Sequence, residues 1–477
     1  MSDGLLSTYD HNGFFCEMFG RRGLSHTRKI RDRLDGMDIA MLRRRAAGAE
    51  RELFNLGITF TVYTDRDAID RVLPFDVIPR VLSTKDWATI ETGVTQRVAA
   101  LNQFLFDIYH KQHILTDGIV PRDLVEGNAN FRPEMIGFDP PHGTYVHICG
   151  TDIVRDEKGG FLVLEDNART PSGVSYVIEN RHLMMRAFSD LADDIPIASV
   201  DDYGSQLARA LAKTAPTGVS DPTVALLSPG VFNSAYFEHV FLAREMGVPL
   251  VEGRDLTVEN DKVYMRTTGG PEQVHAIYRR IDDDFLDPTV FNPDSMLGVP
   301  GLFGAYRKGN VTLANAVGTG VADDKAVYAY MPRIIKYYLD EDPILSNVQT
   351  NICREEAGLQ RTLDNLENLV TKPVGEAGGY GVVVGPKAGK RELADLRRKL
   401  KADPKNFISQ PVVQLSVSPT LINRSVEPRH VDLRPFALTG DSTWVLPGGL
   451  TRVALKRGSL VVNSSQGGGS KDTWVLV

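Results

Sequence analysis

Asp152, Glu165 and Asn167 are the side chains whose types and spacing most clearly suggest chemistry in this sequence. The chain on either side of residues 156–160 is strand-like, and that stretch itself is typical of a turn. A hairpin turning about Lys158-Gly159 would place Asp152 opposite Glu165, with Cβ atoms about 5 Å apart. Glu165 and Asn167 would share a face. These oxygen ligands suit Mg²⁺, which leaves positions for phosphate and water. A solvated acidic hairpin edge is the alternative.

A lysine directly before a glycine-rich stretch is the second candidate feature. Lys372 ends one predicted strand, and residues 382–384 form another. Glycines let backbone N–H groups approach an anion, and a lysine adds a point charge to a phosphate. The pattern GxxxxGK[ST] is absent and the stretch leads into a strand, so a P-loop is not predicted. A plain flexible turn is the alternative; the glycines are Gly375, Gly378, Gly379 and Gly381.

A β-α-β unit is predicted within residues 201–320. Residues 223–227 read as a buried strand, 234–246 as a helix and 248–251 as a second strand. The first turn lacks GxGxxG, so a dinucleotide fingerprint is absent.

A later strand in the same region ends in a cluster of charges, Arg279-Arg280 followed by 282–284. Open α/β sheets bind ligands at the carboxyl ends of their strands, which makes Arg279 and Arg280 candidate contacts for a substrate anion. A solvated loop is the alternative.

The remaining composition describes a globular chain. It has 477 residues, 42% hydrophobic and 24% charged, and a net charge of −7, which argues against nucleic-acid binding. The cysteines are three and far apart, without a CxxC pair, and no HExxH sequence occurs. We find no signal peptide and no apolar run of membrane-spanning length, so a cytoplasmic location without membrane contact is expected.

The early carboxylates and the late lysine–glycine stretch together resemble the ATP-grasp superfamily with its usual order rearranged. The chain is similar to the circularly permuted type 2 ATP-grasp family, which is related to glutathionylspermidine synthase. The resemblance extends from about Asn128 to Trp474 and rests on the stretches 131–135, 150–155, 164–176, 278–285 and 372–375.

The resemblance implies an α/β (α+β) class: a circularly permuted ATP-grasp fold with a pre-ATP-grasp-like β-α-β lobe and an N-terminal helical region. The expected divisions are a mostly helical region (1–127), the metal-ligand hairpin half of the core (128–200), the β-α-β substrate-side lobe (201–320), the ATP-binding lobe (321–415) and the closing strands (416–477).

The resemblance also implies roles for single residues. Asp152, Glu165 and Asn167 would hold Mg²⁺ on the ATP phosphates. Lys325 and Lys372 match the family's two ATP-binding lysines, and the stretch from Gly375 to Gly381 would close over the phosphates. Gln410 would lie where the hinge meets adenine, and Ser172 and Gly173 would lie near the acceptor carboxylate.

One position departs from the family pattern. Many relatives carry an arginine two residues before the metal-binding aspartate, where it contacts the transferred phosphoryl group, and here that residue is Gly150. Arg452 is the first candidate to replace it. The other candidates are Arg155, Arg169 and Arg434.

The function implied is an ATP-dependent carboxylate–amine ligase that acts through an acyl phosphate on an amino acid or peptide-like substrate. A nucleotide-binding module without ligation, which Gly150 favours, and an ATP-grasp phosphotransferase are the alternatives. Neither the two substrates nor the oligomeric state can be named from the sequence.

Overall fold

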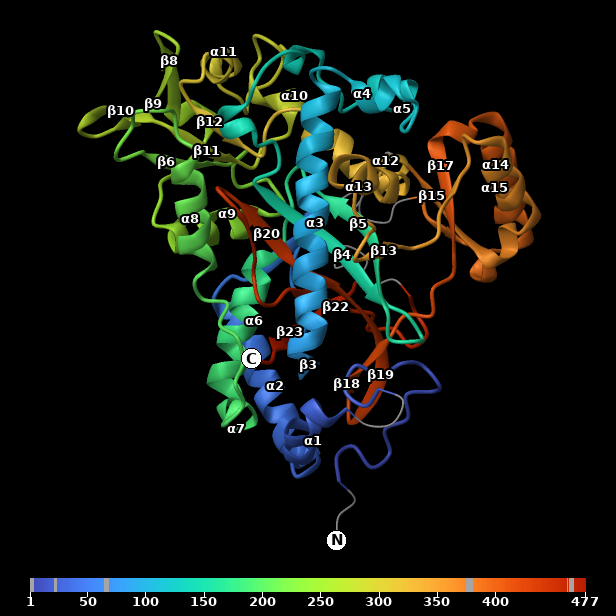
Figure 1. Ribbon diagram of the computed structural model, residues 1–477. Helices are drawn as coiled ribbons and strands as arrows, with labels where there is room; N and C mark the ends of the chain where they lie inside the picture. The colour runs from blue at the N-terminus through green and yellow to red at the C-terminus, as the bar shows by residue number, and fades with distance from the viewer. Residues whose placement is uncertain (1–3, 21–23, 64–67, 375–380, 461, 463–466) are drawn as a thin grey trace.

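A ten-stranded mixed sheet lies at the centre of the computed structural model, which describes residues 4–20, 24–63, 68–374, 381–460, 462 and 467–477 (Figure 1). Its main order is β13-β5-β4-β19-β22-β23-β3, with β18 and β20 attached to β19 and β4, and β21 paired with β20. Segments far apart in the chain therefore lie side by side. The bounds are β3 Phe75–Leu82, β4 Ile148–Arg155, β5 Phe161–Asn167, β13 Ser346–Asn347, β18 Val417–Ile422, β19 Ser425–Arg434, β20 Phe436–Thr439, β21 Thr443–Val445, β22 Leu450–Val453 and β23 Gly469–Val475.

The long helix α3 (Thr84–Ile108) runs across this sheet (Figure 1). Ser83 caps it, because the Ser83 side chain accepts a hydrogen bond from the Asp86 N–H at 3.1 Å. Its apolar residues, spaced at helical intervals, are buried. Arg97 on the same helix pairs with Asp166 of β5 at 2.5 Å, which ties the helix to the hairpin.

The predicted β-α-β unit is confirmed as part of a parallel four-stranded sheet, ordered β12-β11-β6-β7. The helix α9 ends at Met246 and is followed by Gly247, whose φ of +66° suits a glycine just past a helix. A three-stranded antiparallel sheet, β8-β9-β10, extends from this lobe. The bounds are β6 Val224–Leu227, α9 Tyr236–Met246, β7 Leu250–Val251, β8 Leu256–Glu259, β9 Lys262–Thr267, β10 Gly270–Val274, β11 Ala276–Arg279 and β12 Thr312–Ala314.

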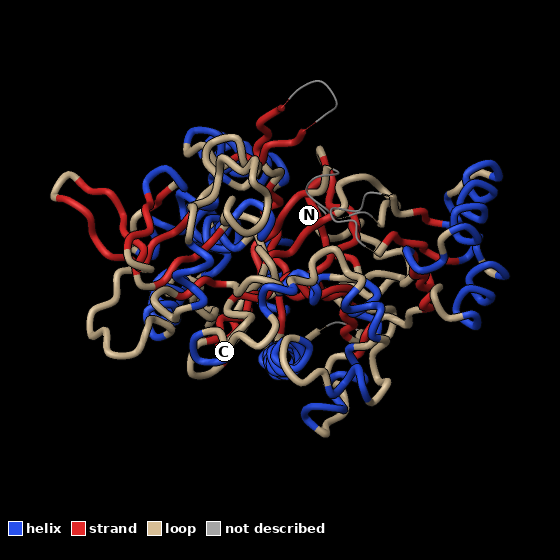
Figure 2. The backbone as a smooth tube through the Cα atoms, turned by 90° about the horizontal axis from the view of Figure 1, so that it is seen from above, coloured by secondary structure: helices blue, strands red, loops and turns tan. Residues whose placement is uncertain are grey.

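A small lobe carries Lys372 at the opposite end of the molecule from β9 and β10 (Figure 2). Its sheet has the order β14-β17-β15-β16, with α14 and α15 packed beside it (Figure 1). Its apolar core, which includes Leu363, Leu396 and Leu400, forms a cluster of its own. The bounds are β14 Asn351–Ile352, α14 Glu356–Asp364, β15 Leu369–Pro373, β16 Val383–Val384, α15 Lys390–Ala402 and β17 Phe407–Pro411.

Local sequence explains where the structure departs from the helices that the apolar and charged pattern predicts over 28–56 and 325–339. The helical pattern over 28–56 divides into α1 and α2, because Asp38 caps the second helix by accepting from the Met41 N–H. The pattern over 325–339 divides into α12 and α13, with Pro332 in the first turn of α13. The region 1–127, expected to be mostly helical, also supplies β3 to the central sheet. The remaining bounds are α1 Arg28–Asp35, α2 Ile39–Asn55, β1 Thr59–Tyr63, β2 Ala68–Val72, α4 His113–Thr116, α5 Arg122–Glu126, α6 Val174–Ala187, α7 Ser189–Ala192, α8 Tyr203–Lys213, α10 Asp283–Leu286, α11 Leu302–Arg307, α12 Lys325–Ala329 and α13 Met331–Leu339.

The carboxyl-terminal segment is a buried strand, because β23 pairs with β3 and β22 and Trp474 has no exposed surface. The described part of the chain contains no helix that combines the length and apolar character required to cross a membrane.

Candidate active site

The register of the β4–β5 hairpin places Asp152 directly opposite Glu165 and Gly150 opposite Asn167. A bulge follows Asp152, so that Ile153 pairs with Val163. The neighbouring carboxylate, Asp166, serves the fold, because Arg97 and the Thr151 hydroxyl both donate to it. The predicted hairpin and the predicted Asp152–Glu165 pair are therefore formed. Nearer the turn the register differs from the prediction by one residue, because Arg155 pairs with Phe161, and the bulge restores the pairing at Asp152.

Asp152 is buried between two guanidinium groups. Arg434 donates to Oδ1 from Nε at 2.5 Å and to Oδ2 from Nη2 at 2.8 Å, and Arg452 donates to Oδ2 at 2.6 Å. Arg452 also donates to Asp432, the residue opposite it between β19 and β22. Burial alone would raise the pKa of Asp152, but the two arginines outweigh burial and hold this pKa well below its usual range.

Glu165 lies beside the lysines that the sequence predicts. Its carboxylate is 4.0 Å from Nζ of Lys325 and 4.0 Å from Nη2 of Arg434. Burial, followed by the charge of Asp152, raises the pKa of Glu165. Burial also lowers the pKa of the Lys372 ammonium to about 8, against the opposing attraction of Glu165. A cation near Asp152 and Glu165 would relieve the repulsion between the two carboxylates.

A cavity of about 230 Å³ is lined by these charged side chains and by apolar ones. Asp152, Glu165, Lys325 and Lys372 line one part of it. Gln410, at the end of β17, lines the cavity and donates to the Thr350 hydroxyl at 3.0 Å. An anionic group would suit the charged part, and a flat ring would suit the apolar part, which is lined by Val370, Val382, Val384, Val412, Val413 and Leu415.

The glycine-rich stretch can be assessed only at its end. Gly375, Gly378 and Gly379 lie outside the described residues. Gly381 has φ +68°, and a Cβ at this position would lie 2.7 Å from Cγ of Pro373. Glycine is therefore required where the stretch enters β16.

The hairpin suits a divalent cation by its donor atoms. In the described part of the chain, no group of three or more His, Cys, Asp and Glu side chains is arranged to hold a metal. A site here would rest on two carboxylates and one amide. Nδ2 of Asn167 donates to the Gly150 carbonyl at 3.1 Å, so Oδ1 is the atom that would meet a cation. Three oxygen ligands from the protein fit Mg²⁺, which usually keeps several waters or phosphate oxygens.

Two of the candidate arginines are held elsewhere. Arg155, at the end of β4, pairs with Glu17 at 3.2 Å and Asp86 at 2.7 Å and lies over the rings of Phe15 and Phe161. Its contacts belong to the fold, and it is not among the described residues that line the cavity.

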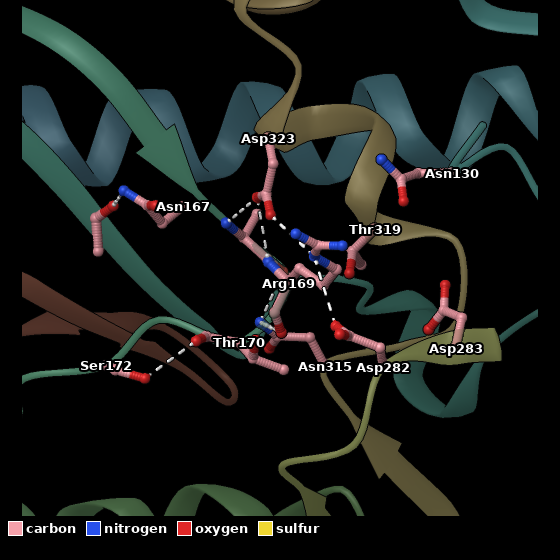
Figure 3. A network of polar contacts seen from close by, with 12 residues as sticks. Asn130, Asn167, Arg169, Thr170, Ser172, Asp282, Asp283, Asn315, Thr319 and Asp323 are labelled. Atoms are coloured by element: carbon pink, nitrogen blue, oxygen red, sulfur yellow. Dashed lines mark hydrogen bonds and ion pairs between the residues drawn. The ribbon is translucent and has the colours of Figure 1, made fainter. Parts of the chain in front are cut away.

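Arg169 lies beyond the end of β5, between Asp323 at 3.3 Å and Asp282 at 3.7 Å (Figure 3). Asp323 also accepts from the backbone N–H groups of Ala168 and Arg169. Burial raises the pKa of Asp323 to about 6. This network fixes the chain directly after Asn167.

Arg279 and Arg280 point into the protein. Arg279 has no exposed surface; it donates to the carbonyls of Asn315, Ile281 and Ala316 and pairs with Asp283 at 2.7 Å. These bonds hold the end of β11 and leave Arg279 in a structural position.

Arg280 instead holds the 171–173 turn. It donates to the Pro171 carbonyl at 2.8 Å and to the Ser172 hydroxyl at 2.5 Å, and it pairs with Glu238 at 3.2 Å. Glu238 in turn accepts from the Gly173 N–H at 2.7 Å. Ser172 and Gly173, which are predicted to lie near the acceptor carboxylate of the substrate, are thus joined to the β-α-β lobe.

Sequence analysis missed Asp432 and Glu238 as parts of this arrangement. Asp432 and Arg434 are two apart on one strand and therefore share a face, a signal that could have indicated Asp432. Glu238 lies within a helix, α9, and no local pattern marks it.

Comparison with known proteins identifies the family of the chain. Residues 79–454 match the family described as "Circularly permuted ATP-grasp type 2". An uncharacterized protein of Synechocystis sp. is 52% identical over 474 residues, covering 99% of this chain and 98% of its own. A protein of Frankia casuarinae named "Putative glutamate--cysteine ligase 2-2" is 41% identical over 477 residues, and the chain spans 54% of its length.

Among solved structures, a glutathione synthetase-like effector of Globodera pallida has the same fold. The TM-score is 0.59 at 11% sequence identity, with 92% of this chain and 98% of that chain covered. On the match over residues 79–454, the chain belongs to the circularly permuted type 2 ATP-grasp family.

Proposed function

We propose that this protein is an ATP-dependent carboxylate–amine ligase that acts through an acyl phosphate. The observation that carries the proposal is one cavity that combines Asp152 opposite Glu165, two lysines and an apolar end beside Gln410. The adenine ring would occupy the apolar end, and the phosphates would reach Lys325 and Lys372.

In the first step, a carboxylate oxygen of the substrate forms a bond to the γ-phosphorus of ATP. The bond from that phosphorus to the bridging oxygen breaks, and its electron pair leaves with ADP. In the second step, an amine nitrogen bonds to the acyl carbon, the carbon–oxygen bond to phosphate breaks, and the nitrogen loses a proton to give the amide.

The protein's part in both steps is positioning and charge neutralisation. Lys325 and Lys372 offset the charge of the phosphates, which would otherwise repel the carboxylate. Mg²⁺ held by Asp152, Glu165 and Asn167 would supply further neutralisation of the phosphates. Ser172 and Gly173 would lie on the acceptor side, held there by Arg280 and Glu238.

An amino acid or a small peptide is the substrate class that we propose. The name of the Frankia relative supports amino-acid substrates for that protein, and ligation of a similar kind for this chain. That relative is about twice as long as the aligned region, so its whole activity need not reside in the part shared with this chain.

The test is ADP release by the purified protein with Mg-ATP, with and without a pool of amino acids, small peptides and polyamines. Stimulation by the pool that is lost in Asp152→Asn supports ATP-driven chemistry. An amide product then establishes ligation, whereas a stable phosphorylated product identifies a phosphotransferase. Nucleotide binding without release under any of these conditions supports a binding module.

Lys372→Met is expected to weaken nucleotide binding and to remove its pH dependence near pH 8. Lys372 has a pKa of about 8 in the protein without nucleotide, and bound phosphates would favour its charged form. Binding therefore takes up a proton, and the affinity of the wild type should fall as pH rises through 8. Calorimetric titration at pH 7 and pH 9 measures this, with the exposed Lys401→Met of α15 as the control. If the nucleotide affinity of Lys372→Met changes between pH 7 and pH 9 as much as that of the wild type, Lys372 does not belong to the phosphate site.

A further inference from the structure

The two arginines on Asp152 are not equivalent. Arg452 makes three hydrogen bonds to Asp432, between 2.5 and 3.0 Å, besides its bond to Asp152. Arg434 has Asp152 as its bonded carboxylate among the described residues, with Glu165 farther away at 4.0 Å. If the Asp152 carboxylate binds a cation in place of the arginines, Arg452 retains its hydrogen bonds to Asp432, whereas Arg434 loses the carboxylate to which it is bonded.

The side chain of Arg434 also fills the space above Gly150. A Cβ on Gly150 would lie 3.2 Å from Cδ and 3.4 Å from Cγ of Arg434. The 3.2 Å separation is tighter than ordinary van der Waals contact, and Cβ of Pro171 would also lie 3.2 Å away, so an alanine at position 150 would require these neighbours to shift by a few tenths of an ångström. Glycine at this position therefore leaves open the space that the Arg434 stem occupies on its way to Asp152.

Arg434 lies between the cavity and the acceptor side. Its Nε and Nη2 meet Asp152, which lines the cavity, while its Nη1 donates to the Ser172 carbonyl at 3.2 Å. Arg452 and Asp432 line the cavity itself. A group that passes from a nucleotide in the cavity to an acceptor near Ser172 would pass Arg434.

We propose that Arg434 is the arginine that contacts the transferred phosphoryl group, and that it exchanges Asp152 for this group when nucleotide binds. This deepens the proposed function and depends on it. In the free protein the Arg434 guanidinium neutralises Asp152; in the complex it neutralises the oxygens of the γ-phosphoryl group. The exchange itself breaks no covalent bond, and during transfer Arg434 stabilises charge on the phosphoryl oxygens while the bridging electron pair leaves with ADP.

Binding of two nucleotides separates this role from a structural one. With Mg²⁺ present, Arg434→Met should weaken binding of the non-hydrolysable analogue AMP-PNP roughly tenfold, the size expected for loss of a charge-assisted hydrogen bond. Binding of ADP, which lacks the γ-phosphoryl group, should change little. Arg434→Lys should keep part of the preference for AMP-PNP. Arg244→Met on α9, whose side chain is 69% exposed, is the control and should change neither affinity.

Moving the guanidinium from β19 to β4 provides an independent arm of the same test. Gly150→Arg combined with Arg434→Ala places the stem of an arginine in the space that the Arg434 side chain occupies in the wild type. Compared with Arg434→Met, the double variant should recover part of the preference for AMP-PNP over ADP. Gly150→Arg alone should impair binding, because two side chains then compete for one space. If Arg434→Met proves unstable on thermal melting, the lysine variant and the double variant decide the question.

The proposal is overturned if the folded Arg434 variants lose AMP-PNP and ADP affinity equally, or lose neither. Wild-type protein that binds neither nucleotide would instead refute the proposed function itself, and the proposal with it.

Discussion

Asp152→Asn is expected to reduce ATP turnover by about 10²-fold or more, since loss of even an outer-shell partner of a metal typically costs about 10–100-fold. The substitution keeps the size of the side chain and removes the charge that would hold Mg²⁺. It also removes the counter-charge between Arg434 and Arg452. The measurement is ADP release across a Mg²⁺ titration, in which the variant should need a higher Mg²⁺ concentration.

Asp156→Asn is the matched control for this prediction. Asp156 lies in the turn of the same hairpin, where its side chain accepts from the backbone N–H groups of Lys158 and Gly160. The control should retain the Mg²⁺ dependence of the wild type. An Asp152→Asn protein with unchanged Mg²⁺ dependence would remove the metal site from the hairpin.

Glu17→Gln is expected to lower the free energy of unfolding by about 3–5 kcal/mol, the cost of breaking a buried charge pair. The Glu17 carboxylate is buried and accepts from Arg80 at 2.8 Å, Arg155 at 3.2 Å and the Ser416 hydroxyl at 2.6 Å. The amide would leave two arginines without their shared charge. Urea denaturation of variant and wild type measures the loss.

The pH dependence of unfolding gives a second reading of the same contact. Burial alone would raise the pKa of Glu17, but Arg80 and Arg155 outweigh burial and lower it. The stabilisation that the Glu17 carboxylate contributes is therefore complete above the pKa of a glutamate in the unfolded chain, about 4.3. This stabilisation is lost as pH falls through the lower pKa of Glu17 in the folded protein. Glu50→Gln on the exposed face of α2 is the control, with an expected change within about 0.5 kcal/mol. A Glu17→Gln protein as stable as this control would show that the pair contributes nothing.

The hairpin could be predicted from sequence because its determinants are local. A turn within residues 156–160 between two strand-like stretches predicts a hairpin with Asp152 opposite Glu165, and the structure has that pair. The pair also depends on the bulge after Asp152, which the sequence pattern did not predict. The β-α-β unit could be predicted for the same reason, since the strand–helix–strand pattern falls within about thirty consecutive residues. A glycine directly after the helix marks where the helix ends.

The partners of the site could not be predicted, because they come from distant parts of the chain. Arg434 is 282 residues from Asp152 and Arg452 is 300 residues away, so no spacing rule connects them. The same limit explains Arg155, whose partner Glu17 is 138 residues away. Arg279 has near partners as well, the Ile281 carbonyl and Asp283, but nothing in the sequence separates these structural contacts from a substrate site. Resemblance to the family predicted the β4–β5 hairpin and the two lysines as parts of one site, and they line one cavity. Choosing among the arginines required their contacts in the structure.

The long separation between Asp152 and its arginines has a consequence for how the protein is made. The ribosome synthesises the β4–β5 hairpin well before Arg434 and Arg452, so for much of synthesis Asp152 has neither arginine beside it. β3 likewise cannot pair with β23 until that strand has been synthesised, and Lys471 of β23 is 395 residues from its partner Asp76 in the sequence. Such non-local pairing folds slowly and exposes strand edges to other chains. A growing chain that has not reached Arg434 cannot complete the site, and we expect nascent protein to need shielding until the last strands emerge.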